Sequence, residues 1–299
     1  MKKNFFLLLC YFIFFYGIEK GYSDSGEKGI PFITNYLTKN YKAHNQNWDI
    51  VEDNRGFKYF ANGNGVLIYD GSNWELIELP NKISSRALGK DQKGIIYTAG
   101  TNDFGYLQPD NFGKLKYISL IDSLGISEIG IIRDIQSVND NIYFRSLEYL
   151  IRLNSKGFSY WKSKSAFTIQ FLYNNDLYII DEEYGLYKLT EDSLVLAPAG
   201  KQFINTELYF AEQYGNDVYL ANRLNGLLKY SPENFGEHNL ITVKSDANRF
   251  LIDELVYCGK IIANGDLILE SQMIPPNVCY FRSSDWQLHE HCPPNALRP

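Results

Sequence analysis

The sequence predicts an all-β fold: a β-propeller of about six four-stranded blades, whose ring is either closed or left incomplete and open. The first observation is a repeat in which a polar turn, a strand with a central aromatic residue, a Gly or short polar loop and an alternating strand follow one another. The central residue recurs in steps of 35 to 49 residues, at Tyr59, Tyr97, Tyr143, Tyr178, Tyr219 and Ile268. The mean step is about 42 residues, which is typical of a four-stranded propeller blade.

The turns and the strand pattern are the second and third observations. Turns before the aromatic strands, such as "DNRG" at 53–56 and "DQKG" at 91–94, contain residue types that accept positive φ angles in hairpins. Apolar residues alternate with period two in short runs, and no segment has a competing helical pattern. Because one blade cannot cover its own apolar faces, blades must stack, and we expect the five tyrosines to fill equivalent structural positions between them.

The N-terminal segment has the features of an export signal. Lys2 and Lys3 precede an uninterrupted apolar run at residues 5–16, which is short for a membrane span but typical of a signal peptide. We therefore interpret residues 1–22 as a signal peptide or an uncleaved signal anchor. The remainder is expected to be periplasmic or extracellular and to meet a membrane only through this segment.

Charge and cysteine content limit the kinds of partner, disulfide and metal site that the sequence predicts. The net charge of −6, with Lys and Arg scattered, leaves no basic patch for phosphates, so nucleic acid is not an expected partner. Three cysteines follow the signal, with no Cys-x-x-Cys spacing, at Cys258, Cys279 and Cys292. One pair can oxidise in an exported protein, and the sequence leaves open which one. "HEHC" at 289–292 contains metal-ligand residue types without a second cluster, so neither a metal nor a cofactor is predicted.

The first two blades and their lead-in also carry a family resemblance. The segment "GIPFITNYLTKNYKAHNQNWDIVEDNRGFKYFANGNGVLIYDGSNWELI" and the following "RALGKDQKGIIYTAGTNDFGYL" resemble the two-component-regulator propeller family, which is often followed by a triple-tyrosine domain. The resemblance covers residues 29–271. It implies an exported ligand-sensing propeller, the input part of a signal-transduction protein whose output is a histidine kinase, a transcriptional regulator or a cyclase.

The blade rhythm is expected to end at Ser271. Residues 272–299 contain two Pro-Pro pairs and read as an aberrant tail, because Pro is a poor residue for a closing strand. Neither a second membrane span nor an output domain follows in the sequence. We therefore expect three parts, namely the signal segment at 1–22, the propeller at 29–271 and the tail at 272–299, in a chain that looks truncated.

Candidate binding residues are polar or aromatic side chains at one end of the blades. The starts of the innermost strands carry Trp48, Arg86 and Arg133. The loops between the second and third strands carry Asn62, Asn64, Asn102, Asp103, Arg145, Glu182, Glu183, Arg223 and Asn225. These groups suit a sugar or an acidic saccharide, since Arg can hold a carboxylate with two hydrogen bonds. The structural alternative is that the Trp and Arg residues pack between blades and that the loop residues stabilise turns or face water.

Three classes of function stay open. The resemblance and the export signal favour a ligand-sensing propeller that is not an enzyme. A propeller enzyme, such as a glycosidase or lyase, would need converging carboxylates, and adjacent loop acids such as Glu182 and Glu183 give no such geometry. A protein-interaction scaffold would need a large apolar patch. The sequence also leaves a homodimer open.

Overall fold

The computed structural model describes residues 34–233, 239–253, 256–271 and 278–281. The chain divides into two compact units, Met1–Tyr36 and Leu37–Pro299, and the strands that the structure describes all belong to the second unit. The predicted signal segment at 1–22 and the "HEHC" motif lie outside the described residues. No described helix is long and apolar enough to cross a membrane.

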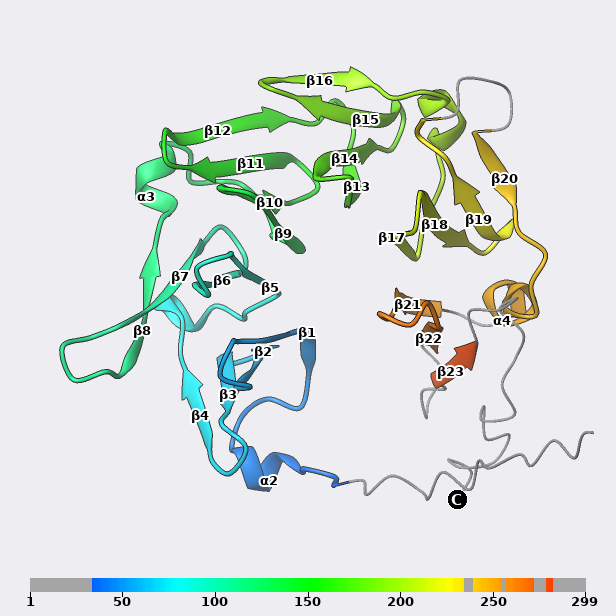
Figure 1. Ribbon diagram of the computed structural model, residues 1–299. Coiled ribbons are helices and arrows are strands. Elements are labelled where there is room, and N and C mark those ends of the chain that lie inside the picture. Colours follow the sequence, from blue (N-terminus) through cyan, green and yellow to red (C-terminus); the bar gives the residue numbers. More distant parts are fainter. Residues whose placement is uncertain (1–33, 234–238, 254–255, 272–277, 282–299) are drawn as a thin grey trace, which may run out of the picture. The chain divides into compact units, whose positions relative to one another are not determined.

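The described strands form six antiparallel sheets, which confirms the all-β propeller prediction (Figure 1). In chain order, blade 1 contains β1 (Asn47–Glu52), β2 (Lys58–Asn62), β3 (Gly65–Tyr69) and β4 (Trp74–Ile77). Blade 2 contains β5 (Ala87–Lys90), β6 (Ile96–Ala99), β7 (Phe104–Pro109) and β8 (Leu115–Ser119). Blade 3 contains β9 (Asp134–Val138), β10 (Asn141–Arg145), β11 (Tyr149–Asn154) and β12 (Gly157–Lys162).

The second half of the chain repeats this order. Blade 4 contains β13 (Phe167–Tyr173), β14 (Asp176–Asp181), β15 (Gly185–Thr190) and β16 (Ser193–Leu196). Blade 5 contains β17 (Phe210–Tyr214), β18 (Asp217–Asn222), β19 (Gly226–Tyr230) and β20 (Leu240–Thr242). Blade 6 has three described strands, β21 (Val256–Ile261), β22 (Leu267–Ser271) and β23 (Val278–Phe281), where four were expected.

Strand β23 corrects the predicted blade boundary at Ser271. It pairs with β22, and its Cys279 and Phe281 are buried in the core of blade 6. The run Val278–Phe281 consists of residues that favour strands, and this preference outweighs the prolines around it in the sequence. Cys279 is disulfide-bonded, whereas Cys258 has a free thiol.

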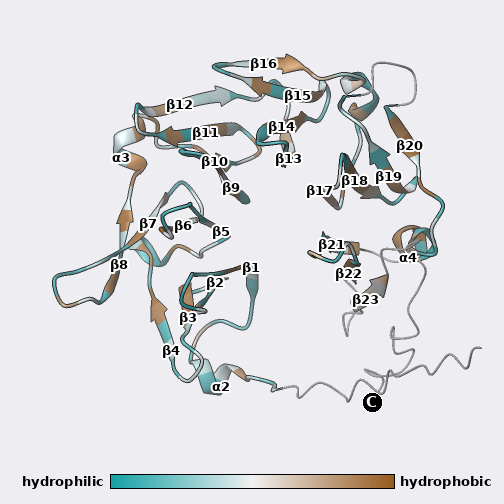
Figure 2. Cartoon of the chain, viewed as in Figure 1, coloured by the Kyte–Doolittle hydropathy of each residue, from teal (hydrophilic) through white to brown (hydrophobic). Residues whose placement is uncertain are grey.

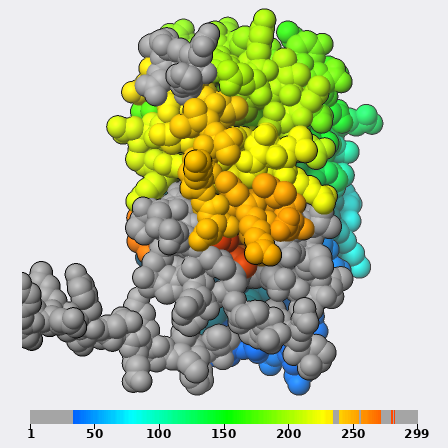
Figure 3. Space-filling model, turned by 90° about the vertical axis from the view of Figure 1, so that its right-hand side faces the viewer, coloured from blue at the N-terminus to red at the C-terminus, as the bar shows by residue number. Residues whose placement is uncertain are grey.

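The helices are short connections. They are α2 (Thr38–Tyr41), α3 (Ile121–Leu124) and α4 (Ala247–Asp253), with 3-10 turns η1 (Pro80–Lys82) and η2 (Gly200–Phe203). Helix α4, which the sequence pattern did not indicate, buries Ala247 and Leu251 against β19. In Figure 3 the residues of blade 5 and of α4, yellow to orange, form one packed surface.

The central tyrosines occupy equivalent positions, as predicted. Each lies opposite the corresponding residue of its innermost strand, in the pairs Val51–Tyr59, Gly89–Tyr97, Gln136–Tyr143, Phe171–Tyr178 and Glu212–Tyr219. The first four are buried and Tyr219 is half-buried. Hydrophobic and hydrophilic residues interleave along the blades in Figure 2, consistent with strands that alternate between packed and polar faces.

Blades pack through their innermost strands. Strands β1 and β5, β5 and β9, β9 and β13, β13 and β17, and β17 and β21 are in contact. Between blades 2 and 3, the rings of Phe104 and Phe144 lie 4.6 Å apart in one buried cluster. A Cβ at Gly89 would lie 2.4 Å from a methyl group of Ile135, so β9 packs directly on the backbone of β5. Blade spacing therefore depends on a residue without a side chain.

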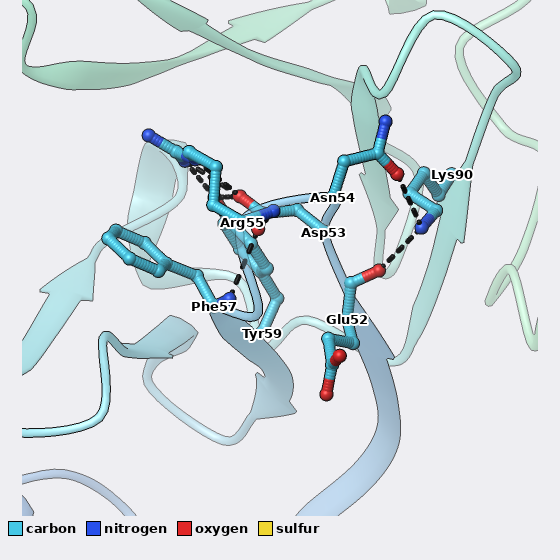
Figure 4. Close-up of polar contacts among 7 residues, drawn as sticks. All are labelled: Glu52, Asp53, Asn54, Arg55, Phe57, Tyr59 and Lys90. Carbon is cyan, nitrogen blue, oxygen red and sulfur yellow. Dashed lines mark hydrogen bonds and ion pairs between the residues drawn. The ribbon is translucent and has the colours of Figure 1, made fainter.

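The predicted Asp-x-x-Gly turns work by a shared hydrogen-bond pattern. In the first of them, Asp53 accepts hydrogen bonds from the amides of Arg55 and Phe57 and from the Tyr59 hydroxyl (Figure 4). The same carboxylate forms an ion pair with Arg55 at 2.7 Å. Gly56 supplies the positive φ of 87° that the turn requires. Lys90 of blade 2 donates to the Glu52 carbonyl, and this joins the turn to the next blade (Figure 4).

Candidate ligand site at the inner strands

The predicted residues at the starts of the inner strands come together in part. The guanidinium Cζ of Arg86 lies 4.0 Å from the ring centroid of Trp48, across the boundary of blades 1 and 2. Stacking of this kind leaves the in-plane N–H groups of a guanidinium directed outward. Among the residues that the structure describes, Arg86 forms no side-chain hydrogen bond or ion pair, so its donors are available.

Arg133 occupies the same backbone position in blade 3 that Arg86 occupies in blade 2. The Arg86 amide donates to the Ala99 carbonyl at 2.7 Å, and the Arg133 amide donates to the Arg145 carbonyl at 2.8 Å. Tyr209 repeats this contact in blade 5. Arg133 is exposed, and within the described part of the chain its guanidinium also has no hydrogen-bond partner. We call Trp48, Arg86, Arg133 and Tyr209 the rim.

The predicted loop residues of blade 2 have structural roles. Asn102 has a left-handed backbone, with φ of 53°, and its side-chain oxygen accepts from the amides of Ile129 and Gly130. Asp103 is buried and accepts a hydrogen bond of 2.6 Å from the Ser119 hydroxyl. For these two residues the structural alternative is therefore supported, because their polar atoms fix the loop.

Two further loop candidates, Glu183 and Arg223, are exposed. Glu183 lies in the turn between β14 and β15, where its amide donates to the Ser165 hydroxyl, and its side chain faces away from the core. Arg223 lies near Tyr209 of the rim, since its positive charge counteracts the rise that burial causes in the pKa of Tyr209. Arg223 therefore adds positive charge beside Tyr209 of the rim. Glu183 remains an exposed residue of its turn.

A second layer of polar side chains lies on the inner strands and, for Arg145, at the end of β10. It contains Asp49, Asp134, Arg145, Gln170, Glu212 and Lys260, which we call the hub. Burial raises the pKa of Asp134, and the neighbouring Arg145, Gln136, Gln170 and Lys260 counteract this rise. Burial also raises the pKa values of Asp49 and Glu212, and the charge of Asp134 adds to both rises. Side chains from blades 1, 3, 4, 5 and 6 therefore interact electrostatically around one carboxylate.

Asp49 connects blade 1 to blade 2. It lies in an irregular stretch of β1 between the paired residues Asn47 and Ile50, and its carboxylate accepts hydrogen bonds of 2.8 Å from the amides of Ile50 and Leu88. Bulges of this kind redirect side chains. Burial raises the pKa of Asp49 to about 6, although the two amides and Lys260 act in the opposite direction. Asp49 therefore changes charge near neutral pH.

Arg145 is the most unusual member of the hub. Blades 1, 2, 4 and 5 have small or apolar residues at this position, namely Ala61, Ala99, Ile180 and Ala221, and blade 6 has Glu270. The side chain of Arg145 is buried, with one hydrogen bond of 3.0 Å to the Phe167 carbonyl and a distant ion pair of 4.0 Å with Asp134. Burial lowers the pKa of Arg145. A buried guanidinium so incompletely paired is costly unless another group completes it.

Sequence reasoning identified Trp48, Arg86 and Arg133 of the rim, but not Tyr209 and not most of the hub. Only Arg145 was among the candidates, and it was assigned to a loop rather than to the end of β10. The signal that could have revealed the others is a polar residue at an inner-strand position, as in "WDIV" around Asp49 and "RDIQ" around Asp134. No group of three or more His, Cys, Asp or Glu in the described residues could hold a metal ion.

The comparisons with known proteins identify the fold. No protein-family model matches the sequence, and no curated protein matches it. A catalytically inactive variant of virginiamycin B lyase from Staphylococcus aureus, solved with quinupristin, is similar at 13% identity, 83% coverage of this chain, 84% of that chain and a TM-score of 0.59. The WD40 β-propeller domain of Doa1 gives 11% identity, 84% and 83% coverage, and a TM-score of 0.60.

A sensor domain also has this fold. The extracellular domain of a hybrid two-component system from B. thetaiotaomicron is similar at 10% identity with a TM-score of 0.57. The match covers 81% of this chain and 34% of that chain, so this chain spans about a third of the sensor domain. At these identities the likeness is one of fold: the chain is a β-propeller that shares its architecture with a lyase, a WD40 domain and a sensor domain.

Proposed function

We propose that this chain is an exported ligand-sensing propeller, the input part of a signal-transduction protein, and that its rim binds an anionic, hydroxyl-rich ligand such as an acidic saccharide. The observation that carries the proposal is the pair of unpartnered guanidiniums at equivalent positions of blades 2 and 3, one of them stacked on Trp48. Guanidiniums bind carboxylates through paired hydrogen bonds, and an indole ring offers an apolar face to a sugar.

Two further observations support a sensor rather than another propeller function. The lead-in and first two blades resemble the two-component-regulator propeller family, and one structural neighbour is an extracellular sensor domain. The N-terminal apolar segment supports a periplasmic or extracellular location. In this proposal the chain binds its ligand without changing it and needs no cofactor, and an output domain on the signalling protein reports the binding.

The test is titration calorimetry with a purified chain lacking the signal segment. The probes are D-galacturonate, D-glucuronate and D-mannuronate, each compared with the neutral sugar that has a hydroxymethyl group in place of the carboxylate. We expect at least one uronate to bind, with affinity that falls as salt increases because the contact is ionic. Product analysis of the same mixtures, with no sugar consumed, would separate binding from catalysis.

The decisive variant is the double substitution Arg86→Gln and Arg133→Gln. It should remove uronate binding while the protein stays folded, because both side chains are partly or fully exposed. Arg249→Gln is the matched control, since Arg249 is 91% exposed and lies far along the chain in α4. A folded double variant that binds uronate as tightly as the wild type would place the ligand elsewhere.

A further inference from the structure

Two side chains of the hub are buried without the hydrogen bonds that they need. Gln170 is 4% exposed, and neither its amide oxygen nor its amide nitrogen has a hydrogen-bond partner. Arg145 is 6% exposed, and its Nε–H has no hydrogen-bond partner, since its distance of 4.0 Å from the Asp134 carboxylate gives a distant ion pair only. Burying such groups without a hydrogen bond lowers stability, and the loss is larger for a charged group. Three unpaired polar atoms at neighbouring positions indicate a place for a polar partner.

Both side chains lie beside Asp134. Residue 145 pairs with residue 134 across β9 and β10. The Gln170 amide lies close enough to the Asp134 carboxylate for a weak polar interaction that counteracts the rise in its pKa, although no atom of Gln170 reaches hydrogen-bonding geometry. The side chain of Asp134 remains 24% accessible to solvent, so this point can be reached from outside. Arg133 of the rim directly precedes Asp134, and its positive charge lies close enough to Arg145 to contribute to the lowered pKa of that guanidinium. Rim and hub therefore adjoin at blade 3.

The charges of the hub decide what kind of group can enter. A ligand carboxylate would meet Asp49, Asp134 and Glu212, and an ammonium group would meet Arg145 and Lys260. A neutral group avoids both repulsions. The unpaired atoms are two donors, Arg145 Nε–H and Gln170 Nε2, and one acceptor, Gln170 Oε1, and Asp134 can accept further. A hydroxyl group both donates and accepts, so two adjacent hydroxyls match this set.

We propose that Asp134, Arg145 and Gln170 form an inner subsite for two adjacent hydroxyl groups of a sugar whose carboxylate is held at the rim. The inference rests on the proposed function and specifies its ligand as a uronic acid residue that enters with its hydroxyl edge first. The rim supplies the charge contact, and the hub selects the arrangement of hydroxyls. Neutral sugars with the same hydroxyls bind to the hub alone, more weakly and with little dependence on salt.

The side-chain resonances of the hub provide a direct test. Isotope-labelled protein is titrated with D-galacturonate and D-galactose, D-glucuronate and D-glucose, and D-mannuronate and D-mannose. The Gln170 amide resonance is assigned by its loss in Gln170→Met, and the Arg145 Nε–H resonance by its loss in Arg145→Leu. We expect both members of at least one pair to shift the two resonances, and only the uronate to lose affinity in Arg86→Gln.

Calorimetry of Gln170→Met gives a second readout. Methionine has a similar length without polar atoms, so this variant should lower uronate affinity by about tenfold or more while the melting temperature of the free protein is unchanged or raised. Gln92→Met is the control, because Gln92 is exposed in a turn of blade 2. A lower melting temperature of free Gln170→Met combined with unchanged affinity would show a purely structural role and overturn the inference.

The outcomes separate this inference from the proposed function. Uronate binding that depends on Arg86 but does not shift the Gln170 and Arg145 resonances would contradict the hydroxyl subsite at the hub and support the carboxylate site at the rim. Shifts of these resonances that are the same for neutral sugars and uronates, and are unaffected by Arg86→Gln, would contradict the carboxylate site and support the hydroxyl subsite. The absence of any shift or heat with all six sugars would overturn both.

Discussion

Arg86 and Trp48 lie at the starts of the inner strands of successive blades, and the guanidinium of one stacks on the indole of the other at 4.0 Å. This contact joins two blades and also presents charge beside an aromatic face. Its structural part should be small, because a cation–π contact at a partly exposed site contributes about 0.5 to 1 kcal/mol. Arg86 therefore contributes little to stability through this contact, and we expect its main role to be ligand binding.

The Trp48–Arg86 contact can be measured by a double-mutant cycle. Urea unfolding of Trp48→Leu, Arg86→Gln and the combined variant should give a coupling free energy of about 0.5 to 1 kcal/mol. If the coupling is near zero, the stacking does not persist in solution. If it exceeds about 2 kcal/mol, the pair is chiefly an inter-blade brace.

Tyr178 should be a structural residue and not a ligand contact. It is 3% exposed and stacks on Phe171 with ring centroids 5.4 Å apart. Tyr178→Ala should lower the free energy of unfolding by about 3 kcal/mol or more, as truncation of large buried aromatics does. Tyr160→Ala serves as the control, since Tyr160 is 51% exposed. Equal melting temperatures for both variants and the wild type would contradict equivalence of the tyrosine positions.

Asp49 should make stability depend on pH. Its pKa rises from the ordinary 3.8 to about 6 in the folded chain because of burial. The folded state thus holds the proton more tightly, and stability falls as pH rises from about 4 to about 6, by up to about 3 kcal/mol above that range. Asp49→Asn removes this loss, so its unfolding free energy relative to the wild type should increase from pH 4 to neutral pH.

Asp70 is the control for this pH dependence, because the pKa shift has the opposite sign. Hydrogen bonds from the amides of Asn73 and Ser72 lower the pKa of Asp70. A lowered pKa gives stability that is present above the unfolded value and lost in acid, so Asp70→Asn should be relatively destabilised at neutral pH. Parallel curves for the two variants between pH 4 and neutral pH would refute the assignment of the Asp49 shift to burial.

The first turn should be more sensitive than an exposed turn of the same sequence type. Burial alone would raise the pKa of Asp53, but hydrogen bonds from Arg55, Phe57 and Tyr59 lower it overall. Asp53→Ala should cost about 2 to 3 kcal/mol in urea unfolding, as loss of hydrogen bonds to a buried charged group does. Asp110→Ala, in the exposed "DNFG" turn, should cost less, and the reverse order would contradict this account.

The fold was predictable because its determinants are local and repeated. Tyr59 and Tyr97 mark the same strand of two blades, and Asp53 and Asp91 cap the same turn, so each repeat confirms the next. Blade 6 was harder, because β23 lies between prolines and only its pairing with β22 identifies it. Strand pairing between distant segments is not visible in a local pattern.

The site was predictable only where a repeated position carried it. Trp48, Arg86 and Arg133 follow from the phase of the repeat, which places them at the same end of the inner strands. Asn102 and Asp103 were also predicted from this pattern, and the structure shows that their side chains hydrogen-bond within the loop. The sequence pattern did not predict the hub, because its members come from five blades and their proximity depends on the spacing of the blades.

The arginine at residue 145 makes the blades similar in backbone but not interchangeable. A chimera in which blade 2 replaces blade 3 would carry Ala99 at this position and Ala87 opposite it, so both charges would leave together. Replacing β10 alone would remove Arg145 and leave the partly buried Asp134 without this counter-ion. Exchange of repeats is thus restricted at this blade, because β9 and β10 must be exchanged together to keep Asp134 paired with Arg145. The blades therefore cannot be reordered freely along the chain.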